Sequence, residues 1–297
     1  TEIKEIDDAV REEIPERIPE ARKKKRRTVP VLKSRDGLMI AFFVPVLVMI
    51  CIFAQRGIFP FGERCFLRTD MYHQYAPFFS EFQHKLRTGG SLLYSWDVGM
   101  GVNFAALYAY YLASPLNWLI LLCPKKFIIE FMTIMIVIKI GLSGLSFAWY
   151  LKQHSKNCIL GVGFFGIFYA LSGYMAAYSW NIMWLDCIVL LPLILHGLER
   201  LVREKKGLFY CLMLGLSILS NYYISIMICL FMVLYYVALL FLEKRPGWKD
   251  CLHSFFLFGV YSLLAGELAA AVLLSEIAEL QSTESGDFNF PTTLELY

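Results

Sequence analysis

Long runs of apolar residues, separated by short polar stretches, dominate the chain from residue 38 onward. A helix that crosses the hydrocarbon part of a membrane needs about 20 mostly apolar residues. The runs that approach or exceed that length are Leu38–Gln55, Phe127–Leu151, Cys158–Tyr178, Trp184–Leu198, Gly207–Leu242 and Cys251–Ser275. This pattern predicts a chain that threads repeatedly through a membrane.

Two apolar segments need further interpretation. Gly207–Leu242 is too long for one crossing, and the polar sequence Ser220–Tyr223 interrupts it, which favours a tight turn between two helices. The segment Phe104–Cys123 is apolar and aromatic but contains Pro115 and two polar side chains. We expect about seven spans, with Phe104–Cys123 as a re-entrant or interfacial segment that does not cross.

The positions of Lys and Arg give the expected orientation. If Phe104–Cys123 does not cross, the basic loops that follow residues 151, 199 and 243 all lie on one side. The loops near residues 180 and 221, which carry no Lys or Arg, then lie on the other side. Cytoplasmic loops are enriched in Lys and Arg. We therefore expect a cytoplasmic N-terminus and a large outer first loop over residues 56–126.

The N-terminal region has a different composition from the rest of the chain. Residues 1–20 are rich in acids, whereas residues 21–35 carry only basic charges. A basic block directly before an apolar run is typical of an anchor on anionic lipid, and we prefer this interpretation to nucleic-acid binding. The predicted domains are a cytoplasmic tail, residues 1–36, whose residues 22–35 contact anionic membrane lipid, and a transmembrane domain, residues 37–297.

Composition supports the membrane assignment. Hydrophobic residues make up 58% of the chain, charged residues make up 18%, and the mean hydropathy is +0.54. Soluble proteins are closer to about 45–50% apolar and about 25% charged. These values exclude an ordinary soluble domain, and the predicted fold class is an all-α membrane protein.

The densest polar group of the expected outer loop is Arg68–Phe79, with the sequence RTDMYHQYAPFF. If Asp70 begins a helix, His73 and Gln74 share a face with it, three and four residues on. Asp70 could equally act only as a helix cap, with the neighbouring aromatic residues placed at the membrane interface. The residues alone leave both interpretations open.

Other polar residues fall near the expected outer ends of the spans. A carboxylate at the centre of a span costs about 2.5–3.5 kcal/mol on insertion scales and usually faces a cavity or a partner. This draws attention to Asp186, and also to Lys139 in the middle of its run. A metal site could combine Asp70 with Asp97 or Asp186. Its only support is that these residues are expected on the same side of the membrane.

Four segments together resemble the YfhO family of bacterial membrane proteins. They are RTDMYHQYAPFF, SWDVGMGVNF, YYLASPLN and LSNYYISIM, which occur in the family's order between the first span and the end of the chain. The resemblance implies a GT-C-type glycosyltransferase of the bacterial cell membrane, of which this chain is an N-terminal part. Such enzymes take a sugar from a polyprenyl-phosphate carrier at the outer leaflet. Relatives are linked to sugar decoration of lipoteichoic acid or similar cell-envelope polymers.

The resemblance also implies roles for particular residues. Asp70 matches the acidic residue that serves the chemistry, and it would take the proton of the acceptor hydroxyl. Arg68 or Arg64 would stabilise the departing lipid phosphate. The residues expected to bind substrate are Arg68, His73, Gln74, Tyr75, Asp97, Asn103, Asp186, Asn221, Tyr222 and Tyr223. No cofactor is firmly implied, although the site leaves room for a divalent metal.

Two other classes of function fit parts of the sequence. A transporter or lipid flippase is expected to show internal repeats and polar or broken helices near the middle of the membrane. Here the polar residues favour the outer ends of the spans, and Lys139 is the main exception. A non-catalytic envelope scaffold is the third hypothesis. The large outer loop with an acid close to the first span favours the enzyme.

Overall fold

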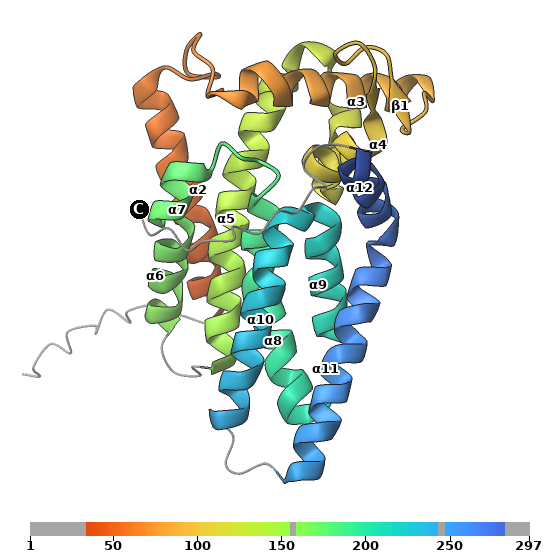
Figure 1. Ribbon diagram of the computed structural model, residues 1–297. Coiled ribbons are helices and arrows are strands. Elements are labelled where there is room, and N and C mark those ends of the chain that lie inside the picture. Colours follow the sequence, from red (N-terminus) through yellow and green to blue (C-terminus); the bar gives the residue numbers. More distant parts are fainter. Residues whose placement is uncertain (1–33, 155–158, 243–246, 283–297) are drawn as a thin grey trace, which may run out of the picture. The chain divides into compact units, whose positions relative to one another are not determined.

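The computed structural model describes residues 34–154, 159–242 and 247–282, in which almost every element is a helix (Figure 1). In chain order the elements are α2 (Ser34–Arg56), η1 (Met71–Tyr75), α3 (Ala76–Thr88), β1 (Tyr94–Ser95), β2 (Val102–Asn103), α4 (Phe104–Leu107), η2 (Tyr108–Leu112), η3 (Pro115–Leu122), η4 (Lys125–Phe127), α5 (Ile128–His154), α6 (Ile159–Ala170), α7 (Gly173–Tyr178), α8 (Leu185–Glu204), α9 (Leu208–Ser220), α10 (Tyr222–Leu242), α11 (Trp248–Leu268) and α12 (Ala270–Ser282). The predicted all-α membrane fold is confirmed. Most of the predicted tail and its lipid-binding block lie outside the described residues.

The predicted spans all form helices, but they are not equally apolar. Among the described residues, five helices are long and apolar enough to cross a membrane: Arg35–Arg56, Lys125–His154, Leu160–Tyr178, Tyr222–Leu242 and Trp248–Leu268. Of the other two predicted spans, α9 has only 13 residues, and α8 carries four charged residues in its second half. The helix α8 packs against α5, α9, α10 and α11. Because it is surrounded by other helices, it can be less apolar than a span that faces lipid.

The last predicted span ends earlier than expected. The apolar run Cys251–Ser275 predicts one helix, but α11 ends at Leu268 and α12 begins at Ala270. Between them, the N–H of Ala269 donates to the carbonyl groups of Gly266 and Glu267, which closes a tight turn. One span is found here, as predicted, over Trp248–Leu268. Its predicted end at Ser275 is wrong, because hydropathy stays high across the break and gives no sign of it.

The segment predicted to be re-entrant is sharply bent. Phe104–Leu112 and Pro115–Leu122 are two apolar helical pieces that meet at 100°, the geometry of a re-entrant loop or a broken span. Ser114 at the bend has an extended backbone, which is the conformation that a following proline favours. The segment does not cross as one straight helix.

The helices α2, α5 and α6 pack with their backbones close together. A Cβ atom on Gly144 of α5 would lie 2.3 Å from the carbonyl oxygen of Ala41 in α2. A Cβ atom on Gly166 of α6 would lie 2.6 Å from the Cβ atom of Ala41. Small residues at such crossings are typical of membrane helices, which associate by close packing. This group of helices positions the end of α2 for the site described below.

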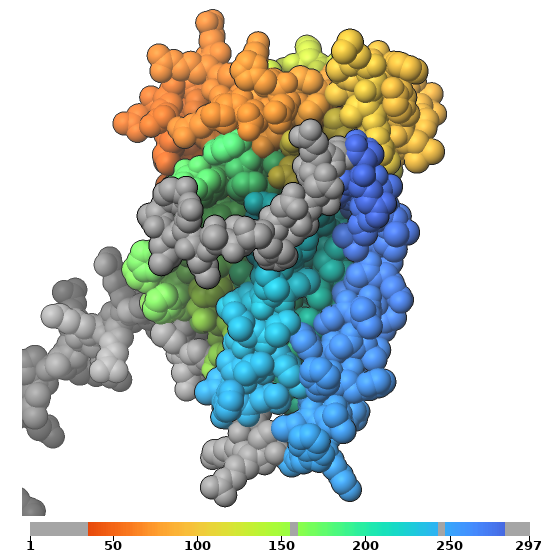
Figure 2. Space-filling view, in the orientation of Figure 1, coloured from red at the N-terminus to blue at the C-terminus, as the bar shows by residue number. Residues whose placement is uncertain are grey.

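Residues 57–124 form a folded layer at one end of the helices, which we call the loop layer. Figure 1 shows α3 lying across the helix ends, and Figure 2 shows the layer from outside, in orange to yellow. Phe82 of α3 is fully buried, and the side-chain amide of Gln83 donates to the carbonyl groups of Ile120 and Cys123 at 2.8 and 2.7 Å. A short antiparallel hairpin joins β1 to β2, with Tyr94 opposite Asn103 and Ser95 opposite Val102. The expected first loop is therefore an ordered layer that packs on the bundle.

Candidate functional site

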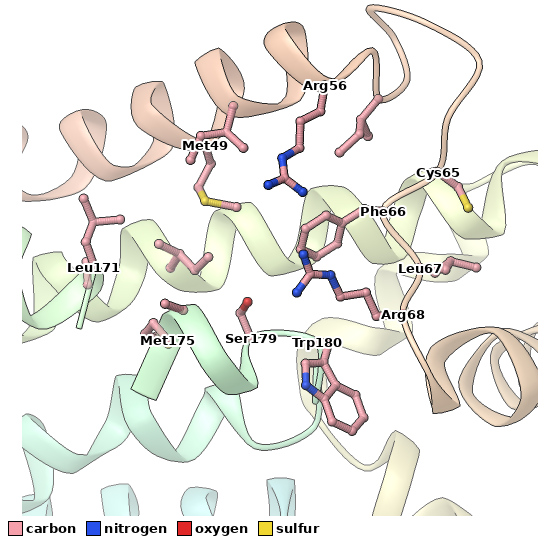
Figure 3. A pocket seen from close by; sticks show the side chains of 15 residues that line it. Met49, Arg56, Cys65, Phe66, Leu67, Arg68, Leu171, Met175, Ser179 and Trp180 are labelled. Carbon is pink, nitrogen blue, oxygen red and sulfur yellow. The ribbon is translucent and has the colours of Figure 1, made fainter. Parts of the chain in front are cut away.

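A cavity of about 430 Å³ lies between the end of α2, the start of the loop layer, and the helices α5, α6 and α7. Most of its wall is apolar, and its polar side chains include Arg56, Arg68, Ser179 and Trp180. Figure 3 shows both arginine side chains directed into the cavity, with the ring of Phe66 between them. We call this space the arginine cavity.

Local structure explains the position of the two arginines. Arg56 is the last residue of α2, where a cation interacts favourably with the negative end of the helix dipole. Gly57 follows with φ at +65°, which reverses the chain beyond the helix. The chain then turns back, and the N–H of Arg64 donates to the carbonyl of Gly57 at 3.1 Å. This return brings Arg68 to the same cavity, whereas Arg64 does not line it.

Neither arginine of the cavity is neutralised by another side chain in the described part of the chain. Within residues 34–154, 159–242 and 247–282, the side chains of Arg56 and Arg68 form no hydrogen bond and no ion pair. Both residues are exposed to the surface of the described chain. Two positive charges therefore face one apolar space without a protein partner, which suits an anion with an apolar body.

Asp70 follows Arg68 by two residues and precedes η1. Thr69 has φ at +40°, so the backbone turns sharply just before Asp70. The Asp70 side chain forms no capping hydrogen bond, so capping does not account for it. The carboxylate is half-buried and makes no hydrogen bond or ion pair with the described part of the chain. Within those residues, no protein group occupies the Asp70 oxygens.

The neighbours of Asp70 point into the protein. The Tyr75 hydroxyl donates to the side-chain oxygen of Asn181 at 2.8 Å, and the Tyr111 hydroxyl donates to that of Gln74 at 3.3 Å. Burial chiefly, with smaller contributions from Tyr111 and then from the Asp70 charge, raises the pKa of Tyr75 above its ordinary value. The structure thus groups Asp70 with Gln74 and Tyr75.

His73, which the sequence places on the same face as Asp70, lies apart from this group. Its ring is exposed and contacts the ring of Tyr72 edge-on, with centroids 5.4 Å apart. The turn of η1 is wider than that of an α-helix, so a face drawn from α-helical spacing does not hold here. His73 therefore lies at the surface of the loop layer.

A row of aromatic rings leads from the arginine cavity across the site. Trp180 lines the cavity and stacks on Tyr75, with centroids 6.4 Å apart. Tyr75 contacts Tyr111 at 5.4 Å, Tyr111 contacts Tyr110 at 4.6 Å, and Tyr110 contacts Tyr222 at 5.7 Å. These five rings, which we call the aromatic row, come from four separate parts of the chain. Asp70 lies within electrostatic reach of two of these rings, Tyr75 and Tyr111.

The far end of the aromatic row carries a second carboxylate. The Tyr222 hydroxyl donates a hydrogen bond to Glu276 of α12, and the amide of Asn103 donates to Glu279 at 2.9 Å. Burial, together with the nearby charge of Glu279, raises the pKa of Glu276, while the bond from Tyr222 opposes that shift. Tyr223, also predicted to bind substrate, is exposed and stacks on Trp184 at 6.1 Å.

Asp186 and Asn221 lie behind the re-entrant segment and hold it in place. Asp186 is buried, forms an ion pair with Lys139 at 2.6 Å and accepts from Ser114 at 3.0 Å. Lys139 is fully buried and also donates to the carbonyl of Ile182 at 3.0 Å. Asn221, also fully buried, donates to the carbonyl of Tyr110 at 3.0 Å. Asp186 and Asn221 were both expected to contact substrate, but their polar groups are occupied by protein partners.

Asp97 lies on the exposed turn between β1 and β2. Its own N–H donates to the hydroxyl of Ser95, but no contact joins its side chain to Asp70 in the described residues. No group of three or more His, Cys, Asp or Glu side chains within those residues could hold a metal ion. The structure therefore does not bring Asp97 into the group around Asp70.

Sequence reasoning missed the role of Arg56 in the cavity and of Glu276 at the end of the aromatic row. Arg56 has one usable signal, which is that it directly follows an apolar run and precedes a glycine. Glu276 has a weaker signal, because it is an acid that directly follows the last apolar run, but its position depends on the break between α11 and α12.

Comparison with known proteins decides the family. The family model described as "Bacterial membrane protein YfhO" matches residues 41–296. The chain belongs to the YfhO family. No curated protein and no solved structure gives a significant match.

The YfhO match covers every part of the site. The arginine cavity, Asp70, the aromatic row and Glu276 all fall inside residues 41–296. Membership makes the chain a bacterial membrane protein, in agreement with its apolar helices. The resemblance seen in the sequence is confirmed at the level of the family.

Proposed function

We propose that this YfhO protein is a glycosyltransferase of the bacterial cell membrane. It would move a sugar from a polyprenyl-phosphate donor to a cell-envelope acceptor, such as lipoteichoic acid. The observation that carries the proposal is the arginine cavity, which combines an apolar wall with two cations that have no partner among the described residues. Asp70, two residues after Arg68, adds a carboxylate that likewise has no partner in the described part of the chain. Together they offer a place for a lipid phosphate and a base beside it.

The arginine cavity suits the donor. A guanidinium group binds phosphate oxygens in a fixed fork geometry and remains charged at every physiological pH. Apolar side chains from α2, α5, α6 and α7 would contact the first units of the polyprenyl chain. Because negative charge builds up on the phosphate as its bond to the sugar breaks, Arg56 and Arg68 would stabilise the departing group.

Asp70 would act as the general base. The acceptor oxygen attacks the anomeric carbon, and the new carbon–oxygen bond forms as the bond to the phosphate oxygen breaks. The Asp70 carboxylate takes the proton of the acceptor hydroxyl, and the lipid phosphate leaves with the electron pair of the broken bond. Such a step needs a carboxylate that no protein cation or donor has already neutralised, as is found at Asp70.

We infer that the loop layer faces the outside of the cell and that the N-terminus is cytoplasmic. The ends of α5, α8 and α11 opposite the loop layer carry Lys152, Arg200, Arg203, Lys205, Lys206 and Lys249 (Figure 1). Cytoplasmic ends of membrane proteins are enriched in such residues. The donor and the acceptor would then meet at the outer leaflet.

A flippase that carries the same lipid remains the alternative hypothesis, and one experiment separates the two. Full-length protein in liposomes would receive a radiolabelled polyprenyl-phosphate sugar and a lipoteichoic acid acceptor. Transfer should fall about 100-fold or more in Asp70→Asn, because general-base catalysis contributes that much. Glu63→Gln, which alters an exposed acid of the same loop layer, is the matched control. Equal transfer by wild type and Asp70→Asn would refute the role of Asp70, and movement of lipid without transfer would favour the flippase.

A further inference from the structure

The aromatic row ends in a surface that differs in charge from the arginine cavity. Tyr110 and Tyr111 of the bent segment meet Tyr222 of α10, and all three rings are half-buried, so each keeps an accessible part. Glu276 of α12 is held against this group by the Tyr222 hydroxyl. Three elements far apart in the sequence thus build one surface of rings and a carboxylate.

The electrostatics of this surface favour a hydroxylated ligand. Among the described residues, Glu276 has Tyr222 as a hydrogen-bond partner and no cation. Glu279 lies close enough to add a second negative charge. Carboxylate oxygens only accept hydrogen bonds, so hydroxyl donors are attracted here and phosphate groups are repelled.

The rings add shape selectivity to that charge. Tyrosine is amphipathic and presents a broad apolar face with a polar tip. A sugar ring has the matching form, with C–H bonds on its faces and hydroxyl groups around its edge. Ligand sites commonly combine aromatic walls with a few polar groups that fix the orientation.

The position of the surface connects it to the chemistry. The Tyr111 hydroxyl lies within electrostatic reach of both Asp70 and Glu276, and it donates to Gln74 beside Asp70. A ligand that lies on Tyr110 and Tyr111 would therefore extend towards the Asp70 carboxylate. The arginine cavity connects to the other end of the aromatic row, because Trp180 lines the cavity and stacks on Tyr75.

We propose that Tyr110, Tyr111, Tyr222 and Glu276 form a binding surface for a neutral, polyhydroxylated ligand, namely the uncharged sugar units of the acceptor and not its anionic phosphate groups. The identification of this ligand as the acceptor rests on the proposed glycosyltransferase function, whereas its chemical class rests on the surface itself. Glu276 acts as a positioning residue that accepts hydrogen bonds from hydroxyl groups. The surface determines which acceptor is presented to Asp70.

The test measures binding without any donor, so it does not depend on transfer. Full-length protein in nanodiscs would be examined by saturation-transfer NMR with maltose and cellobiose, which are neutral, and with glycerol 1-phosphate, which is anionic. We expect saturation transfer to a neutral disaccharide but not to glycerol 1-phosphate. Glu276→Gln removes a charged group that accepts hydrogen bonds, and it should weaken disaccharide binding about tenfold.

Matched variants make the outcome decisive. Tyr110→Leu should also weaken disaccharide binding, because it removes one aromatic ring of the surface. Glu267→Gln, which alters an exposed acid on the neighbouring helix α11, should leave the binding unchanged. Unchanged binding in Glu276→Gln and Tyr110→Leu would overturn the proposal, as would the absence of binding by both disaccharides. If wild type binds a disaccharide but transfers no sugar, the glycosyltransferase function fails while this binding surface stands.

Discussion

The arginine cavity and the surface around Tyr222 and Glu276 lie at the two ends of the aromatic row and have opposite chemistry. The cavity combines an apolar wall with two unpaired cations. The far end combines half-buried tyrosines with Glu276, and Glu279 lies nearby. One region suits an anionic lipid and the other suits a neutral glycan.

This difference suggests how a membrane protein can direct two substrates to one base. A lipid phosphate is attracted to the cavity and repelled from the carboxylates, while hydroxyl groups are attracted to the carboxylates. Under the proposed function, each substrate would be guided by charge to its own end of the aromatic row. The three predictions below test the framework between the regions first, and then each region by itself.

The largest effect is expected from the buried ion pair that supports the bent segment between the two regions. Lys139→Met leaves the Asp186 carboxylate buried without its cation, which should cost about 3–5 kcal/mol of stability. The double variant Lys139→Met/Asp186→Leu should recover most of that loss, because no unpaired charge remains. Thermal unfolding of the purified protein, followed by tryptophan fluorescence, measures both.

The same pair of variants tests the sequence-based prediction that Asp186 binds substrate. If Asp186 serves only the framework, the double variant should be stable and should still transfer sugar. A stable double variant that transfers no sugar would indicate that Asp186 does contact substrate. Lys125→Ala, which removes an exposed cation of η4, is the control.

The next largest effect concerns the arginine cavity. Arg56→Ala and Arg68→Ala should each raise the KM for the lipid-linked donor about 10- to 100-fold, since a hydrogen bond to a charged group contributes about 1.5–3 kcal/mol. The KM for the acceptor should stay unchanged. Donor titration in the transfer assay measures this change. A donor KM that neither substitution alters would refute the proposal that the arginine cavity binds the donor.

The smallest effect is a pH dependence at the other region. Because burial, aided by Glu279, raises the pKa of Glu276, this carboxylate takes up its proton at a higher pH than an ordinary glutamate. The protonated form is a weaker acceptor of hydrogen bonds, so the KM for the acceptor should rise as the pH falls through that range. The dependence should be absent in Glu276→Gln, and its persistence there would assign it to another group.

Much of the fold could be predicted from hydropathy, because the membrane requires long apolar helices. The bend at Ser114 and Pro115 could also be predicted, since proline disfavours a helical residue before it. The break at Ala269 could not, because it lies between apolar helices and carries no signal of composition. The interior helix α8 could not be distinguished from a lipid-facing span, since that depends on its neighbours.

The site could be predicted in part. Local spacing grouped Asp70 with Gln74, because they share one short segment, but it also grouped them with His73, which lies at the surface. The partners of Asp186 and Asn221 lie on other helices, and a single sequence does not contain those contacts. For the same reason Arg56 and Glu276, which meet the site only through folding, were not selected.

Kinetics with both substrates varied test the central claim most directly. The claim is that one side of Asp70 binds the donor and the other side binds the acceptor. Initial rates of sugar transfer would be measured for wild type, Arg68→Ala and Glu276→Gln over a grid of donor and acceptor concentrations. We predict that Arg68→Ala raises only the donor KM and that Glu276→Gln raises only the acceptor KM. If both variants raised the KM of the same substrate, or if wild type transferred no sugar, the division into two regions would be contradicted.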